Sequence, residues 1–293
     1  MSANTDRRLW STTPKRLSEF VGAILEVGIP STSVRNLQKA FQANGFYPAR
    51  DLPQFCVPEP PDIFFSYHSA QDFVAVQEIV WQTIDYAARQ LRRNRPELTR
   101  EFMEPIIADG IRLWVDFMFI DQAARNLREE LDVLPQLLHG ASAHFVLGNK
   151  PLTRAWCCYE LALFNEDLAK SDVPQFPSAQ GAQLRSFIAP SRNFYLGWER
   201  TETTEEADKV FVGERITAAF PGGFDGFDHV MAQANSVAVL PLTEGTAWST
   251  PGADEKLVHA AEAWFSRPLR WRNESTNPGN HAGGPPNPPL QRT

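Results

Sequence analysis

The chain of 293 residues carries 28 Lys and Arg residues against 35 Asp and Glu residues, so its formal net charge at pH 7 is -7. Hydrophobic residues make up 43% of the sequence, the composition of an ordinary globular protein. The acidic balance argues against a nucleic-acid partner, because general affinity for phosphates comes from clustered Lys and Arg. No apolar run reaches the ~20 residues that cross a bilayer, and the first residues lack the apolar core of a signal peptide. We therefore expect no membrane partner.

The cysteine and histidine content also restricts the class of protein. Three cysteines, Cys56, Cys157 and Cys158, are too few for a disulfide framework, which favours a reducing, cytoplasmic environment. Buried and unreactive thiols are the expected state of the adjacent pair. The six histidines are scattered along the chain, so the sequence predicts no metal site.

Residues 1–60 are expected to form a small helical appendage that ends in a linker. An apolar stripe at helical spacing predicts a helix over residues 15–28, and residues 31–33 supply N-cap chemistry for a second helix. The segment 48–61 contains five prolines and is typical of a linker. The helices between residues 15 and 45 either dock a protein partner or pack against the main domain.

Between residues 61 and 220, short apolar runs alternate with amphipathic segments. The apolar runs predict strands over residues 62–67, 111–120 and 143–148. The helical periodicity predicts helices over residues 73–94, from Asn126 past Leu138 with a kink or late start at Pro135, and from Thr153 to about residue 170. This alternation predicts an α/β fold with a parallel sheet covered by helices.

The C-terminal part carries weaker signals. Further elements are expected as a strand at 192–198, a helix at 204–219, a strand at 236–242 and a last helix from Thr250. The stretch PGGFDGFDH at 221–229 lacks the ligand spacing of a calcium loop and is typical of a turn. Residues 221–272 are expected to form a C-terminal extension, and residues 273–293, rich in Asn, Pro and Gly, a disordered tail.

Three segments together resemble the TIR domain (Toll/interleukin-1 receptor/resistance protein) over residues 61–220. They are PDIFFSYHSAQD at 61–72, LWVD at 113–116 and RAWCCYEL at 154–161. The resemblance implies a flavodoxin-like parallel sheet flanked by helices. The run WVDFMFIDQ followed by RAWCCYEL also resembles the related heterokaryon-incompatibility domain, although Phe119 stands where that family has a cysteine.

Many TIR domains cleave NAD between nicotinamide and ribose, so the resemblance implies an NAD glycohydrolase or cyclase in an immune or cell-death pathway. The catalytic glutamate of that family corresponds to Glu160. The family's tryptophan on the same helix corresponds to Trp156, which we expect to pack on the substrate. The other positions implied to line the cleft are Ser66, Tyr67, His68, Ser69 and Asp116. NAD is the substrate, so no separate cofactor is implied, and TIR domains commonly act through self-association.

A single carboxylate is sufficient for this reaction. Nicotinamide starts as a cationic pyridinium and leaves neutral, so it needs no general acid, whereas an ordinary glycoside does. A carboxylate can orient the ribose hydroxyls and stabilise the oxocarbenium ion. Each residue also has a structural interpretation: Glu160 can face solvent, Trp156 can belong to the core, His68 can cap a loop and Asp116 can bind backbone N–H groups.

Two other functions stay open. A non-enzymatic signalling adaptor that acts by homotypic assembly would not need Glu160. A glycosyl-transferring enzyme for another nucleoside would use a similar carboxylate. The chain also departs from the TIR pattern in the long interval between Asp72 and Leu113, in the apolar loop after Asp116 and in its length beyond residue 220.

Overall fold

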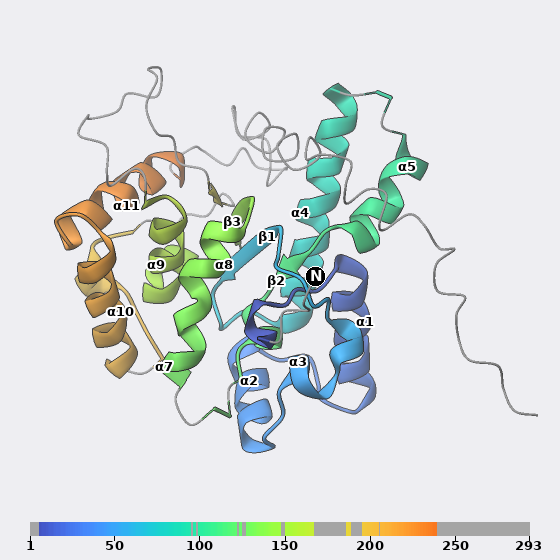
Figure 1. Ribbon diagram of the computed structural model, residues 1–293, viewed down its shortest axis with the longest axis horizontal. Helices are drawn as coiled ribbons and strands as arrows, with labels where there is room; N and C mark the ends of the chain where they lie inside the picture. The colour runs from blue at the N-terminus through green and yellow to red at the C-terminus, as the bar shows by residue number, and fades with distance from the viewer. Residues whose placement is uncertain are drawn as a thin grey trace, which may run out of the picture.

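A computed structural model describes residues 6–94, 96–97, 99–121, 123–124, 127–147, 150–166, 186–188, 195–204 and 206–238. In this part of the chain, a parallel sheet has the strand order β2-β1-β3-β4. Figure 1 shows the sheet between two groups of helices, one that includes α8 to α11 and one that includes α1 to α4.

The strands are β1 (Ile63–Tyr67), β2 (Leu113–Trp114), β3 (Ala143–Leu147) and β4 (Phe187–Ile188). The α-helices are α1 (Pro14–Glu26), α2 (Val34–Ala43), α3 (Pro48–Asp51), α4 (Phe73–Asn94), α5 (Arg100–Pro105), α6 (Asp116–Phe119), α7 (Leu127–Glu130), α8 (Leu134–Gly140), α9 (Ala155–Phe164), α10 (Glu206–Ala219) and α11 (Phe224–Ala238). Single turns of other helix types are η1 (Arg7–Leu9), η2 (Pro53–Phe55), η3 (Ile106–Gly110), η4 (Leu131–Val133), η5 (Pro151–Thr153) and η7 (Trp198–Arg200).

The central strand β1 is buried along its whole length. Phe64 lies opposite Trp114 of β2 and His144 of β3 in the strand register. Its ring stacks on that of Trp114, with 4.6 Å between the centroids. Helices lie on both faces of the sheet (Figure 1), so the side chains on both sides of β1 are buried, which explains why its sequence is a continuous apolar run.

The structure confirms much of the predicted alternation. The strand β1, the helix α4 and the strand β3 lie where the sequence pattern places them, and α10 covers most of the helix predicted at 204–219. Pro135 stands in the first turn of α8, where its missing N–H has no helical partner, so this helix starts late as expected.

The strand predicted at 111–120 is wrong for most of its length. Only Leu113–Trp114 pairs with β1, and Asp116–Phe119 forms the helical turn α6, whose apolar residues are buried. A short apolar run does not distinguish a buried strand from a buried helical turn, because both place every side chain in the core. The helix expected up to residue 170 also ends sooner, at Phe164.

The strand predicted at 192–198 is wrong where the structure describes it. Residues 195–197 have no regular structure, and Trp198–Arg200 forms the 3-10 turn η7. Gly197 has a φ of 106°, which interrupts an extended chain. The described strand in this region is β4, earlier in the chain.

The strand predicted at 236–242 is wrong at residues 236–238, which belong to α11. The stretch 221–229 starts as the expected turn and then enters this helix, with positive φ angles at Gly222 and Gly223. The remainder of that strand, the last helix from Thr250 and the tail lie outside the described residues.

The N-terminal helices share one hydrophobic core with the sheet. Leu17 and Phe20 of α1 and Leu37 of α2 are fully buried in the same cluster as the strands. Within the segment 48–61, α3 and η2 form short helical turns. The division of the chain near residue 60 and the docking role of residues 15–45 stay predictions.

The start of α2 is also tied to the loop that follows β1. The backbone N–H of Val34 donates to the carbonyl of Gln71 at 2.7 Å, and that of Arg35 to the carbonyl of Ser69 at 2.8 Å. These bonds satisfy N–H groups that a helix leaves unpaired in its first turn. The position of α2 therefore sets the position of this loop.

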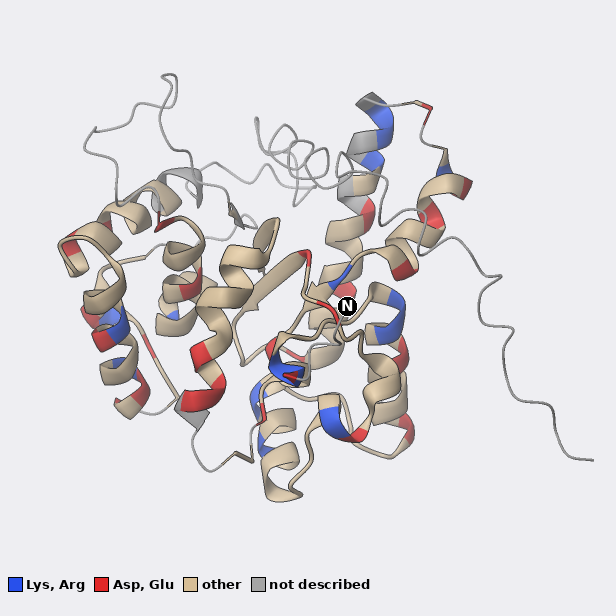
Figure 2. Cartoon of the chain, in the orientation of Figure 1, with Lys and Arg blue, Asp and Glu red and all other residues tan. Residues whose placement is uncertain are grey.

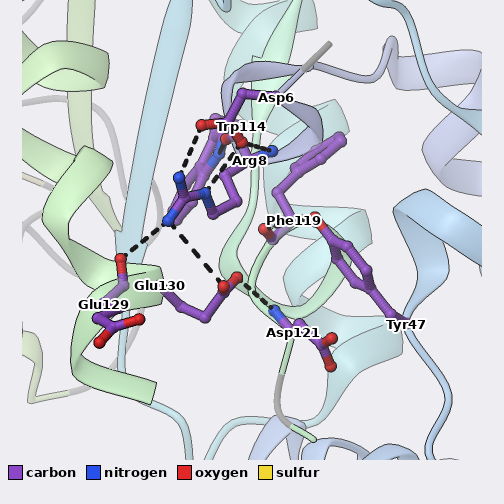
Figure 3. Close-up of polar contacts among 8 residues, drawn as sticks. All are labelled: Asp6, Arg8, Tyr47, Trp114, Phe119, Asp121, Glu129 and Glu130. Atoms are coloured by element: carbon purple, nitrogen blue, oxygen red, sulfur yellow. Dashed lines mark hydrogen bonds and ion pairs between the residues drawn. The ribbon is translucent and has the colours of Figure 1, made fainter. Parts of the chain in front are cut away.

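Polar contacts tie the first residues to the chain around β2 (Figure 3). Arg8 binds the carboxylate of Asp6 at 2.8 Å and the backbone carbonyl of Glu129 at 2.9 Å. The indole N–H of Trp114 donates to the carbonyl of Arg8 at 3.1 Å. The N-terminal segment is thus held to both β2 and α7.

The same cluster holds the loop after β2 (Figure 3). The hydroxyl of Tyr47 donates to the carbonyl of Phe119 at 3.1 Å, and the N–H of Asp121 donates to the carboxylate of Glu130 at 3.3 Å. Both contacts lie directly after Asp116, so they restrict the turn that carries its side chain.

Two leucines of α1 test whether this helix belongs to the core. Leu17 is fully buried, whereas Leu25 is 39% exposed. We expect Leu17→Ala to lower the free energy of unfolding by about 2–5 kcal/mol and Leu25→Ala by less than about 1 kcal/mol. Urea unfolding followed by circular dichroism measures both values. Equally small losses for the two variants would contradict a shared core.

Candidate active site

A cavity of about 290 Å³ lies at the carboxyl-terminal edge of the sheet. Its walls come from the end of β1, the end of β2, the first residue of α6, the helices α9 and α2, and the chain near the start of α10. Ligands of open α/β folds bind at this edge, outside the carboxyl ends of the strands. The volume is close to the lower end of the roughly 300–1,000 Å³ that small-molecule sites occupy.

The structure brings most of the predicted site residues together. The residues that line the cavity include Ser66, Tyr67, Ser69, Asp116, Trp156 and Glu160. His68 does not belong to the lining. Its Nδ1 accepts the N–H of Ala70 at 3.0 Å, which is the loop-capping role that the sequence left open.

Glu160 presents a carboxyl group from an otherwise buried helix. The other residues of α9 are buried except for Trp156, which stands one turn earlier on the same face. The hydroxyl of Ser66 donates to Oε2 of Glu160 at 2.5 Å. The side chain is partly accessible from the cavity but surrounded by protein, and this burial raises its pKa to about 8. The hydrogen bond from Ser66 opposes the increase, and the charge of Asp116 adds to it.

A buried chain of polar groups continues behind Glu160. Oγ of Ser66 lies 2.7 Å from Nε2 of His144, and Nδ1 of His144 lies 2.9 Å from Oγ of Ser186. The hydroxyl of Ser186 in turn accepts from the amide of Asn165 at 2.6 Å. Four residues from β1, β3, the start of β4 and the end of α9 thus connect the carboxyl group to the core.

The donors and acceptors available allow one direction of hydrogen-bond donation along this series of polar groups, from Asn165 to Glu160. The carbonyl of Leu161 can only accept, so the amide nitrogen of Asn165 faces both it and Ser186. Ser186 then donates to Nδ1 of His144, and the Nε2–H of His144 donates to Ser66. Burial lowers the pKa of His144 to about 3, so the ring is neutral, with one donor and one acceptor nitrogen. The Ser66 hydroxyl is left to donate to the carboxylate.

Asp116 is held by side chains from two other elements. The hydroxyl of Tyr67 donates to one carboxylate oxygen, and Nε2 of Gln38 donates to the other at 3.1 Å. Burial nevertheless raises the pKa of Asp116. The cavity is therefore lined by three carboxyl groups, those of Asp116, Glu160 and Asp208, and the first two each accept at least one hydrogen bond.

Trp156 belongs to the cavity wall and also to a small aromatic cluster. Its ring centroid lies 6.0 Å from that of Phe211 and 6.3 Å from that of Tyr159. These contacts leave the residue partly exposed. Both interpretations of the sequence, packing and substrate contact, are compatible with this position.

Sequence reasoning missed the contribution of α2 and of His144. The cavity-lining residues of α2 are Arg35, Gln38, Lys39 and Gln42, which recur at the spacing of one helical face. That polar stripe, opposite the buried apolar one, was the available signal. His144 stands inside an apolar strand, and its partner Ser186 is distant in the sequence, so only the structure reveals their contact.

The cysteines are buried, as the sequence predicts. The thiol of Cys157 lies 3.3 Å from the carbonyl of Tyr67 and that of Cys158 3.2 Å from the carbonyl of Leu152. Burial raises the pKa of both thiols, which disfavours the reactive thiolate. Within the described ranges, no cluster of His, Cys, Asp and Glu side chains is arranged to hold a metal ion.

Comparisons of the chain with family models, curated proteins and solved structures find no match. None of the helices that the structure describes is long and apolar enough to cross a membrane.

The raised pKa of Glu160 leads to a prediction about how the stability of the protein depends on pH. A carboxyl whose pKa rises from 4.5 to about 8 on folding contributes stability below pH 4.5, and this contribution is lost as the pH rises through 8. We therefore expect Glu160→Gln to be increasingly more stable than wild type between pH 5 and pH 9. Urea unfolding at both pH values measures the difference, with Glu78→Gln on the exposed side of α4 as control. A difference that does not change with pH would contradict the shifted pKa.

Proposed function

We propose that the protein cleaves the bond between nicotinamide and ribose in NAD, with Glu160 as the catalytic carboxylate. The observation that carries the proposal is a carboxyl group in a cavity at the ligand-binding edge of the sheet, held by Ser66 and one helical turn from Trp156. The resemblance of residues 61–220 to TIR domains supports the same role. The order β2-β1-β3-β4 agrees with a flavodoxin-like sheet.

The reaction needs one negative charge close to the ribose. As the C1′–N bond breaks, its electron pair passes to the pyridinium nitrogen and nicotinamide leaves neutral. The carboxylate of Glu160 stabilises the oxocarbenium ion that remains, and Ser66 keeps this carboxylate in place. Water then adds to C1′ and loses a proton, which gives ADP-ribose. Attack by a nitrogen of the adenine ring instead would give a cyclic product.

The environment of Glu160 suits this chemistry. A cavity enclosed by protein strengthens the attraction between a carboxylate and a developing cation, for the same reason that it raises the carboxyl pKa. The cationic nicotinamide ring favours the ionised carboxylate when NAD binds. Trp156 offers an aromatic surface beside this charge, on which the ring can pack.

Self-association of the TIR-like part is the expected means of control. TIR enzymes are commonly inactive until they assemble. An immune or cell-death role requires a low resting activity. The non-enzymatic adaptor is the alternative, because it would use the same assembly surfaces without the chemistry of Glu160.

A nucleoside hydrolase is a second candidate that one observation favours. With a pKa of about 8, Glu160 is largely protonated at neutral pH, and a protonated carboxyl can donate to a neutral leaving base. Asp116, in the same cavity, could then supply the negative charge. Two carboxyl groups in separate roles are typical of glycoside cleavage.

Loss of NAD tests the proposal. We expect the wild-type protein to convert NAD to nicotinamide and ADP-ribose or a cyclic form. Glu160→Gln should lower the rate at least a hundredfold, because it removes the charge that stabilises the cation. Chromatography of the products measures both proteins, dilute and at high, crowded concentration. Glu78→Gln is the control. Equal NAD loss with Glu160→Gln would exclude this carboxylate, and no loss in the wild type under either condition would favour the adaptor.

The pH profile separates the two enzymatic candidates. For NAD, kcat/KM should rise with pH and level off above about 8, because the free enzyme needs the ionised carboxylate. For a nucleoside with a neutral base, activity should fall as the pH passes 8, because the acid is lost. Rates between pH 5.5 and 9.5 on NAD, adenosine and inosine distinguish these cases. A profile for NAD that falls through pH 8 would contradict the proposed mechanism.

A further inference from the structure

Two arginines that the proposed cleavage step does not use also line the cavity. Arg35 belongs to the first turn of α2, and Arg154 directly precedes α9, the helix that carries Glu160. Figure 2 shows basic residues along α2. The two arginines therefore line the cavity from two different elements, one of which lies before the region of TIR resemblance.

Most hydrogen-bond donors of these two groups have no partner among the residues that the structure describes. Arg154 is only 6% exposed, and its guanidinium donates to the hydroxyl of Thr204 at 3.1 Å. Nη2 of Arg35 approaches the hydroxyl of Ser69 only at 3.5 Å, and its Nε is buried without a hydrogen-bond partner. Among the residues that the structure describes, neither arginine takes part in an ion pair. A guanidinium offers five N–H donors, so both retain capacity for a ligand.

The local charges favour an anion at this position. A buried cation without a counter-charge is unfavourable, and two neighbouring cations repel each other. Burial and then the charge of Arg35 lower the pKa of Arg154, while Cys157, Glu202 and Asp208 act in the other direction. Among the described residues no ion pair joins either acid to Arg154, although the carboxyl group of Asp208 also lines the cavity. A phosphate group would satisfy both guanidinium groups, because its oxygens match their planar fork.

We propose that Arg35 and Arg154 form a diphosphate subsite beside Glu160, so that the cavity selects a dinucleotide over a free nucleoside. The inference rests on the proposed function for the placement of the ribose over Glu160. Lys39, one turn after Arg35 on the cavity-lining face of α2, adds a third positive charge. The N-terminal helices thereby contribute directly to substrate recognition.

Binding of inorganic pyrophosphate and ADP tests the subsite without any cleavage. Calorimetry at fixed salt would compare the wild-type protein with Arg35→Gln, with Arg154→Gln and with Lys15→Gln, whose side chain lies on the surface against Asp109. We expect each cavity variant to weaken binding of both ligands roughly tenfold to a hundredfold, and Lys15→Gln less than twofold. Adenosine binding should be unchanged in all of them. Thermal unfolding checks that the variants are folded, and Arg35→Gln decides the result if the more deeply buried Arg154 does not tolerate substitution.

The subsite and the proposed cleavage fail in different ways. Pyrophosphate binding that Arg35→Gln abolishes, in a protein that never cleaves NAD, supports the subsite and removes the NAD glycohydrolase. NAD cleavage with the same KM in the wild type and in Arg35→Gln supports the NAD glycohydrolase and removes the subsite. Wild-type protein that binds neither pyrophosphate nor ADP at millimolar concentration would also overturn the subsite.

Discussion

The candidate site depends on one hydrogen-bonded chain that crosses the core behind Glu160. The parallel register of β1 and β3 places Ser66 opposite Val146, so Ser66 and His144 are diagonal neighbours on one face of the sheet. The helix α9 covers that face and brings the carboxyl group to Ser66. Every side chain in this hydrogen-bonded series has a partner. Removal of one would leave a buried polar group unsatisfied and would lower the free energy of unfolding by about 1–3 kcal/mol. The position of the carboxyl group and the packing of the sheet are therefore set by the same contacts.

The N-terminal helices complete the cavity around this carboxyl group. The helix α2 binds the loop after β1 through its backbone, and Gln38 donates to Asp116. Both contacts join residues before position 60 to the region of TIR resemblance. The helix α2 therefore adds a cavity wall to the region of TIR resemblance, together with the positive charges of Arg35 and Lys39.

Local pattern and strand topology were sufficient to predict part of this arrangement. Trp156 and Glu160 share a helical face because they are four residues apart. The resemblance to TIR domains implied that Ser66 and Asp116 line the cleft, and both line the cavity, where neighbouring parallel strands end at the same edge of the sheet. The parts of the site and fold that the sequence did not predict were missed for physical reasons. His144 and the side chains of α2 reach the site through contacts between distant segments, which no local periodicity records. The short apolar runs failed as strand signals where burial on all sides made strand and helical turn indistinguishable.

The most direct test of catalysis by Glu160 combines binding and turnover. Calorimetry measures NAD binding to Glu160→Gln, while chromatography measures NAD cleavage by the wild-type protein under the same conditions. Catalysis by this carboxylate predicts that the variant still binds NAD and leaves it intact, whereas the wild type cleaves it. A variant that cleaves NAD at the wild-type rate would contradict this role, as would a wild-type protein that binds NAD without ever cleaving it.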